Sequence, residues 1–201
     1  LATGSNEFRQ LQILSDAVKQ MSEGELLQIR KTRKLNFDEG VYFDIIRGKT
    51  ASLLSSACAA GAYSTSNNEN TTAQMKLFGE KVGIAFQIKD DLFDYGKDNI
   101  GKPTGNDIKE KKLTLPLIYS LNNVSPQTRR QLVYIMKNEN KDPAKIKFVI
   151  DAVTESGGIK YATEKMNSYR DEALSILHSF EESPTRKALE ELVRYTTDRK
   201  Y

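Results

Sequence analysis

Cysteine is nearly absent from this sequence, which has one such residue, Cys58, among 201. Since a single thiol cannot form an internal disulfide, we expect a reducing, cytoplasmic environment. Long apolar runs are also absent, because no stretch approaches the ~18 consecutive apolar residues of a membrane-spanning helix. The sequence therefore predicts no membrane span.

Strong charge of either sign is lacking as well. The 30 basic and 27 acidic residues leave a net charge of +3, and no stripe of lysine and arginine alternates with aromatic residues. Nucleic acid is therefore not an expected partner. The composition, with 38% hydrophobic and 28% charged residues, is typical of a globular protein. The length suits a single domain over residues 1–201.

Signals for a β-sheet are missing, because no hairpin dipeptide lies between segments of alternating polarity. Apolar residues instead recur at intervals of three and four positions, which predicts helices. We expect Asp38 to cap a long helix and Pro116 to mark a kink or a break. The expected helices cover residues 5–20, 22–30, 38–63, 70–95, a stretch from 107 onward, 126–137, 143–155, 158–179 and 184–198. The predicted fold class is all-α.

The segment QIKDDLFDY, which starts at Gln87, places three aspartates near the end of an apolar helix. At ~100° per residue, Gln87, Asp90, Asp91 and Asp94 share one arc with Gly83, and apolar residues cover most of the remaining surface. A helix that is apolar almost all round is buried by neighbours on several sides. We therefore expect the polar strip to face an internal cavity, where Gly83 leaves room.

Carboxylates at this position carry an electrostatic cost. The last turn of a helix holds the negative end of its dipole, so each carboxylate there is unfavourable by roughly 0.3–1 kcal/mol. Asp90 and Asp94 also repel each other across one turn, and no local partner offsets these costs. Mg²⁺ prefers oxygen ligands, takes one or two protein carboxylates and completes its shell with water and phosphate oxygens. The pattern favours a Mg²⁺ site, and the alternative is a solvated acidic helix end.

Metal-bound phosphate would need further cations nearby. The string RGKTASLL places Lys49 and Thr50 among small and apolar residues, where both side chains can enter the same cavity. The alternative for Lys49 is a surface lysine with a partly buried stem. The loop GKPTGND holds Lys102 between glycine and proline, a position suited to capping a phosphate. The pattern GxxxxGK[ST] is absent, so these lysines would act as point charges.

Five segments together resemble one protein family. GELLQ, RGKTA, GIAFQIKDDLFDY, GKPTGNDIKE and KLTLPLIY occur in this order, and they closely resemble the polyprenyl synthetases, the trans-isoprenyl diphosphate synthases, especially bacterial octaprenyl-type enzymes. The resemblance implies the isoprenoid synthase fold, a helical bundle around a central cavity. It also implies a homodimer that condenses isopentenyl diphosphate with an allylic diphosphate, head-to-tail and with Mg²⁺, to a long-chain polyprenyl diphosphate.

The resemblance further implies roles for residues around the metal. Asp90, Asp91 and Asp94 match the second aspartate-rich motif of the family, with Asp90 as the direct ligand and Asp94 acting through bound water. Lys112 matches a basic residue before the TLP segment. Gln28, which follows GEL, resembles a polar position that faces the cavity.

The resemblance also implies roles for residues that contact the allylic substrate. Lys49 and Lys102 resemble the lysines that hold its diphosphate, and Thr50 and Gln87 resemble the pair beside the reacting carbon. Fixed positive charge stabilises the departing diphosphate, and an apolar chamber keeps water from the allylic cation. No nucleophile is needed in this reaction. We therefore expect Cys58 to be packed on a helix and His178 to be exposed.

One departure from the family pattern concerns the first aspartate-rich motif, DDxxD or a longer variant, and the isopentenyl diphosphate site, which are absent from this sequence. We therefore expect the N-terminal part of the fold to be missing and these 201 residues to be inactive alone. Two other functions stay open, namely a non-catalytic subunit of a heteromeric prenyl diphosphate synthase and a helical scaffold without activity. Product lengths of C15, C40 and C50 all remain open.

Overall fold

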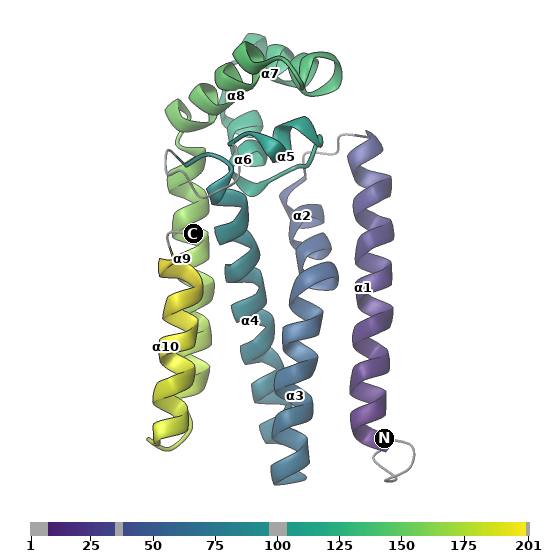
Figure 1. The fold of residues 1–201 in the computed structure, drawn as a ribbon, viewed down its shortest axis with the longest axis vertical. Coiled ribbons are helices and arrows are strands. Elements are labelled where there is room, and N and C mark those ends of the chain that lie inside the picture. The colour runs from purple at the N-terminus through teal and green to yellow at the C-terminus, as the bar shows by residue number, and fades with distance from the viewer. Residues whose placement is uncertain (1–7, 35–37, 97–103, 200–201) are drawn as a thin grey trace.

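The computed structural model describes residues 8–34, 38–96 and 104–199, and these residues form helices and connecting loops without a strand (Figure 1). The all-α prediction is confirmed. The α-helices are α1 (Phe8–Lys34), α2 (Glu39–Ile46), α3 (Ser52–Ser66), α4 (Glu69–Phe93), α5 (Asn106–Lys109), α6 (Leu115–Asn123), α7 (Pro126–Tyr134), α8 (Pro143–Glu155), α9 (Gly158–His178) and α10 (Pro184–Asp198). Two π-helical turns, η1 (Arg47–Ala51) and η2 (Ile135–Glu139), complete the described elements.

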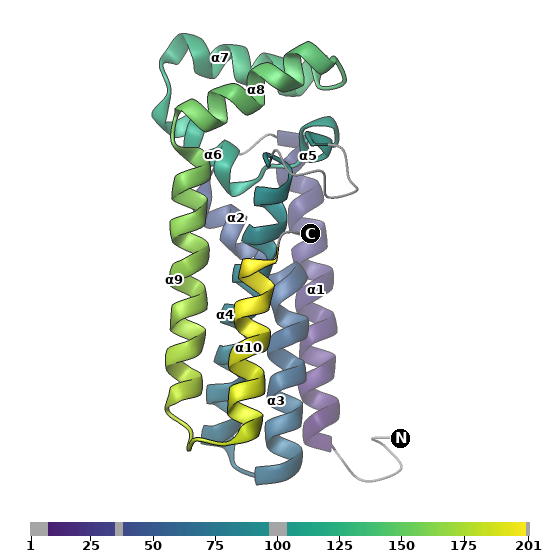
Figure 2. The same ribbon diagram turned by 60° about the vertical axis from the view of Figure 1, so that its left-hand side comes forward.

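The long helices run along the long axis of the molecule. The chain rises through α1, descends through α2, η1 and α3, and rises again through α4 (Figure 1). After α7 and α8, which lie across the upper end, α9 descends and α10 rises beside it (Figure 2). Helix α4 packs against both α3 and α9, so it is the central helix. Within the described ranges, no helix has the length and apolar character needed to cross a membrane.

Local signals set most helix starts. Asp38 accepts a hydrogen bond from the backbone N–H of Val41 at 2.9 Å, so the cap expected there is confirmed. Prolines open helices α6, α7, α8 and α10, where the missing N–H has no helical partner to lose. The break expected at Pro116 is confirmed, because α5 ends at Lys109 and α6 starts at Leu115.

Helix boundaries differ from the prediction at three places. The helix expected over 126–137 ends at Tyr134 and continues as η2. The helices expected over 5–20 and 22–30 form the single helix α1, because the Ser22 hydroxyl donates to the Val18 carbonyl inside the helix instead of capping a new one. The helix expected over 38–63 is interrupted by η1, in which the Ser52 N–H donates to the Arg47 carbonyl five positions earlier. This wider turn brings RGKTA to the cavity described below.

Apolar residues pack into three buried clusters along the bundle. One lies at the upper end among α6, α7, η2 and α8, and another at the lower end among α4, α9 and α10. Cys58 packs against the lower cluster and His178 is exposed, as expected. The middle cluster joins α2, η1, α4, α6 and α9, and it consists of Tyr42, Ile46, Ala51, Ile84, Ala85, Ile88, Leu115, Ile118, Ala162 and Met166. It supports one wall of the cavity.

Gly83 brings α4 against η1. A Cβ atom at this position would lie 2.6 Å from the Cα of Ala51, so the two helices can approach only because the side chain is absent. The expectation that Gly83 leaves room beside the polar strip is therefore wrong. Its missing side chain is used for packing, and this contact holds η1 next to the strip.

The effect of Gly83→Ala on stability tests this contact. We expect the free energy of unfolding to fall by about 1–3 kcal/mol, because a methyl group against a backbone atom forces the helices apart. Urea denaturation measures the loss. Gly61→Ala on α3 is the matched control, since its Cβ meets nothing within 4 Å and alanine favours a helix by roughly 0.5–1 kcal/mol. Equal effects of the two changes would contradict the close approach.

Candidate functional site

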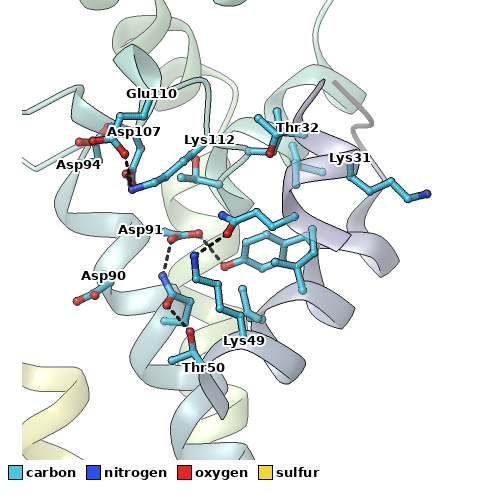
Figure 3. Close-up of a pocket in the computed structure, with 18 of the residues that line it drawn as sticks. Lys31, Thr32, Lys49, Thr50, Asp90, Asp91, Asp94, Asp107, Glu110 and Lys112 are labelled. Carbon is cyan, nitrogen blue, oxygen red and sulfur yellow. Dashed lines mark hydrogen bonds and ion pairs between the residues drawn. The ribbon is translucent and has the colours of Figure 1, made fainter. Parts of the chain in front are cut away.

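A cavity of about 610 Å³ lies near the upper end of the bundle, between α1, α2, η1, the end of α4 and the segment that contains α5. Figure 3 shows several of its charged side chains. Apolar wall residues include Val41, Ile45, Ile46, Phe93, Leu113 and Ile118. The sequence-predicted site residues that line it are Gln28, Lys49, Thr50, Gln87, Asp90, Asp91, Asp94 and Lys112. Lys102 lies outside the described residues.

The π-helical turn directs two consecutive side chains to different neighbours. The Lys49 ammonium donates to the Gln28 side-chain oxygen at 2.7 Å and lies 2.8 Å from a Glu25 carboxylate oxygen. The Thr50 hydroxyl donates to the Gln87 side-chain oxygen at 3.0 Å. Lys49 is therefore held by α1 and Thr50 by α4. A π-turn of this kind occurs frequently at functional sites.

Asp91 is the most deeply buried aspartate of the three in the motif. It is only 6% exposed, and three donors reach it. The Tyr42 hydroxyl donates at 2.7 Å, the Gln87 amide at 3.2 Å and the Leu115 backbone N–H at 3.3 Å. A buried acceptor without partners would cost about 1–3 kcal/mol, so these contacts stabilise a charge that α4 alone destabilises.

Burial dominates the acid–base behaviour of this pair. It raises the pKa of Asp91 to about 7, with the charge of Asp107 adding to the effect and the donors from Tyr42, Gln87 and Leu115 opposing it. Burial likewise raises the pKa of Tyr42 well above its ordinary value, and the charge of Asp91 adds to that. Tyr42 therefore stays protonated as a donor.

Asp94 organises the segment that follows α4. Its two carboxylate oxygens accept hydrogen bonds from the backbone N–H groups of Asn106 at 2.7 Å and Asp107 at 3.1 Å. Burial and the charge of Asp107 raise the pKa of Asp94, and the backbone donors oppose this. The expectation that no local partner offsets the cost of these aspartates is therefore wrong for Asp91 and Asp94.

Asp90 differs from the other two aspartates because its side chain is 44% exposed and faces the cavity. One of its oxygens forms an ion pair with Arg199, which follows the last turn of α10. The Arg199 guanidinium also lies over the rings of Phe86, at 4.3 Å from the centroid, and Phe93, at 5.2 Å. The Arg199 guanidinium therefore occupies part of the position beside Asp90 where the sequence predicts a metal cation.

Lys112 lies among carboxylates on the opposite wall. Its ammonium is 3.1 Å from Asp107 and 2.7 Å from Glu110, and Figure 3 shows these groups beside Asp94. Burial acts to lower the pKa of Lys112, but the two carboxylates outweigh it and raise the pKa. The lysine therefore remains a fixed positive charge at neutral pH.

Comparison with known proteins identifies the family. A family model described as polyprenyl synthetase matches residues 1–153. This chain belongs to the polyprenyl synthetase family. Solanesyl diphosphate synthase 1 of Arabidopsis thaliana is 31% identical over 191 residues, which are 94% of this chain and 46% of that protein. Heptaprenyl diphosphate synthase component 2 of Geobacillus stearothermophilus is 30% identical over 194 residues, or 94% of this chain and 59% of that protein.

A solved structure extends the similarity to the fold. A polyprenyl synthase from Caulobacter crescentus, in complex with calcium and isoprenyl diphosphate, is 30% identical, with a TM-score of 0.90 over 99% of this chain and 61% of that one. The isoprenoid synthase fold implied by the sequence motifs is confirmed. This chain spans about half to three fifths of the length of these family members.

Among the cavity residues that were not predicted from the sequence, four form the side-chain contacts described above, namely Tyr42, Asp107, Glu110 and Arg199. Tyr42 lies two helical turns before Lys49, and this spacing could have been used to predict that both side chains lie on the cavity side of the helix. Asp107 is the last residue of the segment GKPTGND and Glu110 lies three positions later, but the prediction for this segment concerned only its lysine. Arg199 is 109 positions from its partner Asp90, and no local pattern could connect the two.

The pH dependence of stability tests the burial of Asp91. Between its ordinary pKa of 3.8 and about 7, the folded state binds this proton more strongly than the unfolded state. The contribution of Asp91 to stability therefore falls as the pH rises through this range. Asp91→Asn removes that contribution, so the stability of the variant relative to wild type should increase with pH. Urea denaturation across the range measures it, with Asp151→Asn on α8 as the control. Parallel curves for wild type and Asp91→Asn would contradict the prediction.

Proposed function

We propose that this chain supplies the allylic diphosphate site of a trans-prenyl diphosphate synthase, an enzyme that condenses isopentenyl diphosphate with an allylic diphosphate. One observation carries the proposal. A single cavity combines an accessible carboxylate, Asp90, with two fixed ammonium groups, Lys49 and Lys112, and with apolar walls. This combination suits a ligand with a charged phosphate end and a hydrocarbon end.

Mg²⁺ fits the donor set of this cavity when the diphosphate shares in holding it. Among residues 8–34, 38–96 and 104–199, no three acidic, histidine or cysteine side chains form a cage for a metal ion. Mg²⁺ needs only one or two protein carboxylates when phosphate and water supply the remaining ligands. Asp90 would hold it, because Asp91 and Asp94 are engaged by backbone and side-chain donors. Bound Mg²⁺ would neutralise the charge that develops on the leaving diphosphate.

Lys49 and Lys112 have different roles at the phosphate end of the cavity. Lys49 rests against Gln28 and Glu25, both on α1, so its ammonium is positioned before any ligand binds. Lys112 is held in the same way by Asp107 and Glu110. Preorganised charges stabilise a developing anion without reorganisation. We assign Lys49 to the diphosphate itself and Lys112 to a supporting charge behind the metal position.

The apolar walls serve the other half of the reaction. Breakage of the allylic C–O bond leaves a carbon cation that water would capture, so Ile45, Ile46 and Phe93 act by excluding water. The isopentenyl double bond then attacks this carbon, and a proton leaves to the departed diphosphate. Thr50 and Gln87 line the space where the cation forms.

A second candidate is a subunit of a two-component synthase. The heptaprenyl relative of 30% identity is named as component 2 of its enzyme, which favours this reading over a plain scaffold. Prenyl transfer that appears only after a second protein is added would establish it. The homodimer and the cytoplasmic location remain proposals. The names of the family members above differ in chain length, so the proposal concerns the reaction rather than one product.

Asp90→Ala tests the metal position. We expect calorimetry to show Mg²⁺-dependent binding of a non-reactive geranyl thiodiphosphate to the wild type, weakened about tenfold or more in the variant, because a charged ligand group worth about 1.5–3 kcal/mol is lost. Asp151→Ala, an exposed aspartate on α8, should bind like wild type. Unchanged affinity in Asp90→Ala would refute the assignment, and absence of binding to the wild type would favour the scaffold.

Arg199→Gln tests the competition for Asp90. The ion pair is partly exposed, so it is worth about 0.2–1 kcal/mol, and its removal should strengthen the binding of Mg²⁺ alone by up to about fivefold. Arg194→Gln on α10 makes the same change of charge on an exposed side chain. Calorimetric titration with Mg²⁺ compares the two. An equal change in both variants would mean that net charge, and not the Arg199 contact, controls affinity.

A further inference from the structure

Tyr42 is a buried polar residue to which neither the family motifs nor the proposed reaction assigns a role. Its side chain is 4% exposed in the middle apolar cluster, yet its hydroxyl donates to Asp91 at 2.7 Å on the wall of the cavity. The hydroxyl is the first member of a hydrogen-bonded chain. Asp91, Gln87 and Thr50 follow it in order.

The direction of this chain follows from the chemistry of its members. The Tyr42 hydroxyl and the Leu115 N–H both donate to one oxygen of Asp91, and the Gln87 amide nitrogen donates to the other. Because an ionised carboxylate only accepts, Gln87 turns its nitrogen toward Asp91 and its oxygen away when Asp91 carries its charge. That oxygen accepts from the Thr50 hydroxyl, so the hydroxyl hydrogen of Thr50 is already used.

These hydrogen bonds determine which atoms of Thr50 and Gln87 the cavity presents to a ligand. With the chain running from Thr50 to Gln87 to Asp91, the Thr50 and Gln87 oxygens have only lone pairs left for a ligand. Lone pairs repel the oxygens of a diphosphate and stabilise an electron-poor carbon. The Lys49 ammonium, next in sequence to Thr50, favours the diphosphate instead. Lys49 therefore attracts the diphosphate end of the allylic C–O bond, and Thr50 attracts its carbon end.

We propose that Tyr42 is a positioning residue: by holding Asp91 it fixes the orientation of the Gln87 amide, and thereby presents oxygen lone pairs to the carbon end of the allylic C–O bond. This inference rests on the proposed function for the identity of the ligand. The orientation of Gln87 does not depend on that function, and it can be measured separately. Tyr42 itself touches neither the substrate nor the reacting atoms in this scheme.

The test compares two tyrosines of the same chemistry. Tyr161 also donates its hydroxyl to a carboxylate at 2.7 Å, that of Glu39, but neither residue lines the cavity. In the complete protein, Tyr42→Phe should lower kcat about tenfold or more and change KM for the allylic diphosphate little, because an interaction made in the transition state is lost. Tyr161→Phe should leave both parameters unchanged.

A spectroscopic measurement reports on Gln87 directly. In ¹⁵N–¹H correlation spectra at mildly alkaline pH, the Gln87 side-chain amide, assigned by its loss in Gln87→Leu, should exchange slowly with water in the wild type and in Tyr161→Phe. In Tyr42→Phe it should exchange faster. Asp91→Asn provides a second variant, since an amide nitrogen can replace one acceptor oxygen. It should alter the Gln87 signals and lower kcat at least as much.

The outcomes separate the two proposals. A lower kcat together with altered Gln87 signals in Tyr42→Phe supports the inference. An unchanged Gln87 amide overturns it, as does a rise in KM with unchanged kcat. If the wild type performs no prenyl transfer, the proposed function fails, and the amide spectra still decide whether Tyr42 orients Gln87. If Tyr42→Phe does not fold, Tyr42→Met, which also lacks the hydroxyl, gives the same decision.

Discussion

The hydrogen bonding of one buried carboxylate, that of Asp91, determines how the cavity is built. A charge in this position is unfavourable for α4, since it lies at the negative end of the helix dipole and out of water. Donors from α2, from α4 and from the start of α6 converge on it. The carboxylate therefore joins three elements, and their positions define the cavity wall on which Thr50 and Gln87 lie.

The three aspartates of QIKDDLFDY have separate tasks as a result. Asp94 orders the segment after α4 through two backbone N–H groups, and Asp91 orders the cavity wall. Asp90 keeps an exposed carboxylate that can bind a cation, and in this structure that carboxylate pairs with the Arg199 guanidinium. Under the proposed function, this motif of three acidic residues would supply one carboxylate to Mg²⁺, an ion that takes only one or two protein carboxylates.

Helix positions were largely predictable, because capping residues, prolines and apolar spacing act within one or two turns. Asp38 and Pro116 are examples in which a local signal and the structure agree. The π-turn η1 was not predicted. It packs against Gly83 on a different helix, and a local pattern does not reveal a contact of this kind. The continuity of α1 was missed for a different reason, because Ser22 resembles a cap but bonds to Val18 within one helix.

The sequence by itself determined the family, the all-α class and eight of the residues that line the cavity, because motif order and helical periodicity are properties of the linear chain. Tertiary structure alone decided how those residues are used. Tyr42 reaches Asp91 across 49 positions and Arg199 reaches Asp90 across 109. Hydrogen-bond partners at such separations depend on how whole helices pack, and packing depends on side-chain volumes throughout the core rather than on any short pattern.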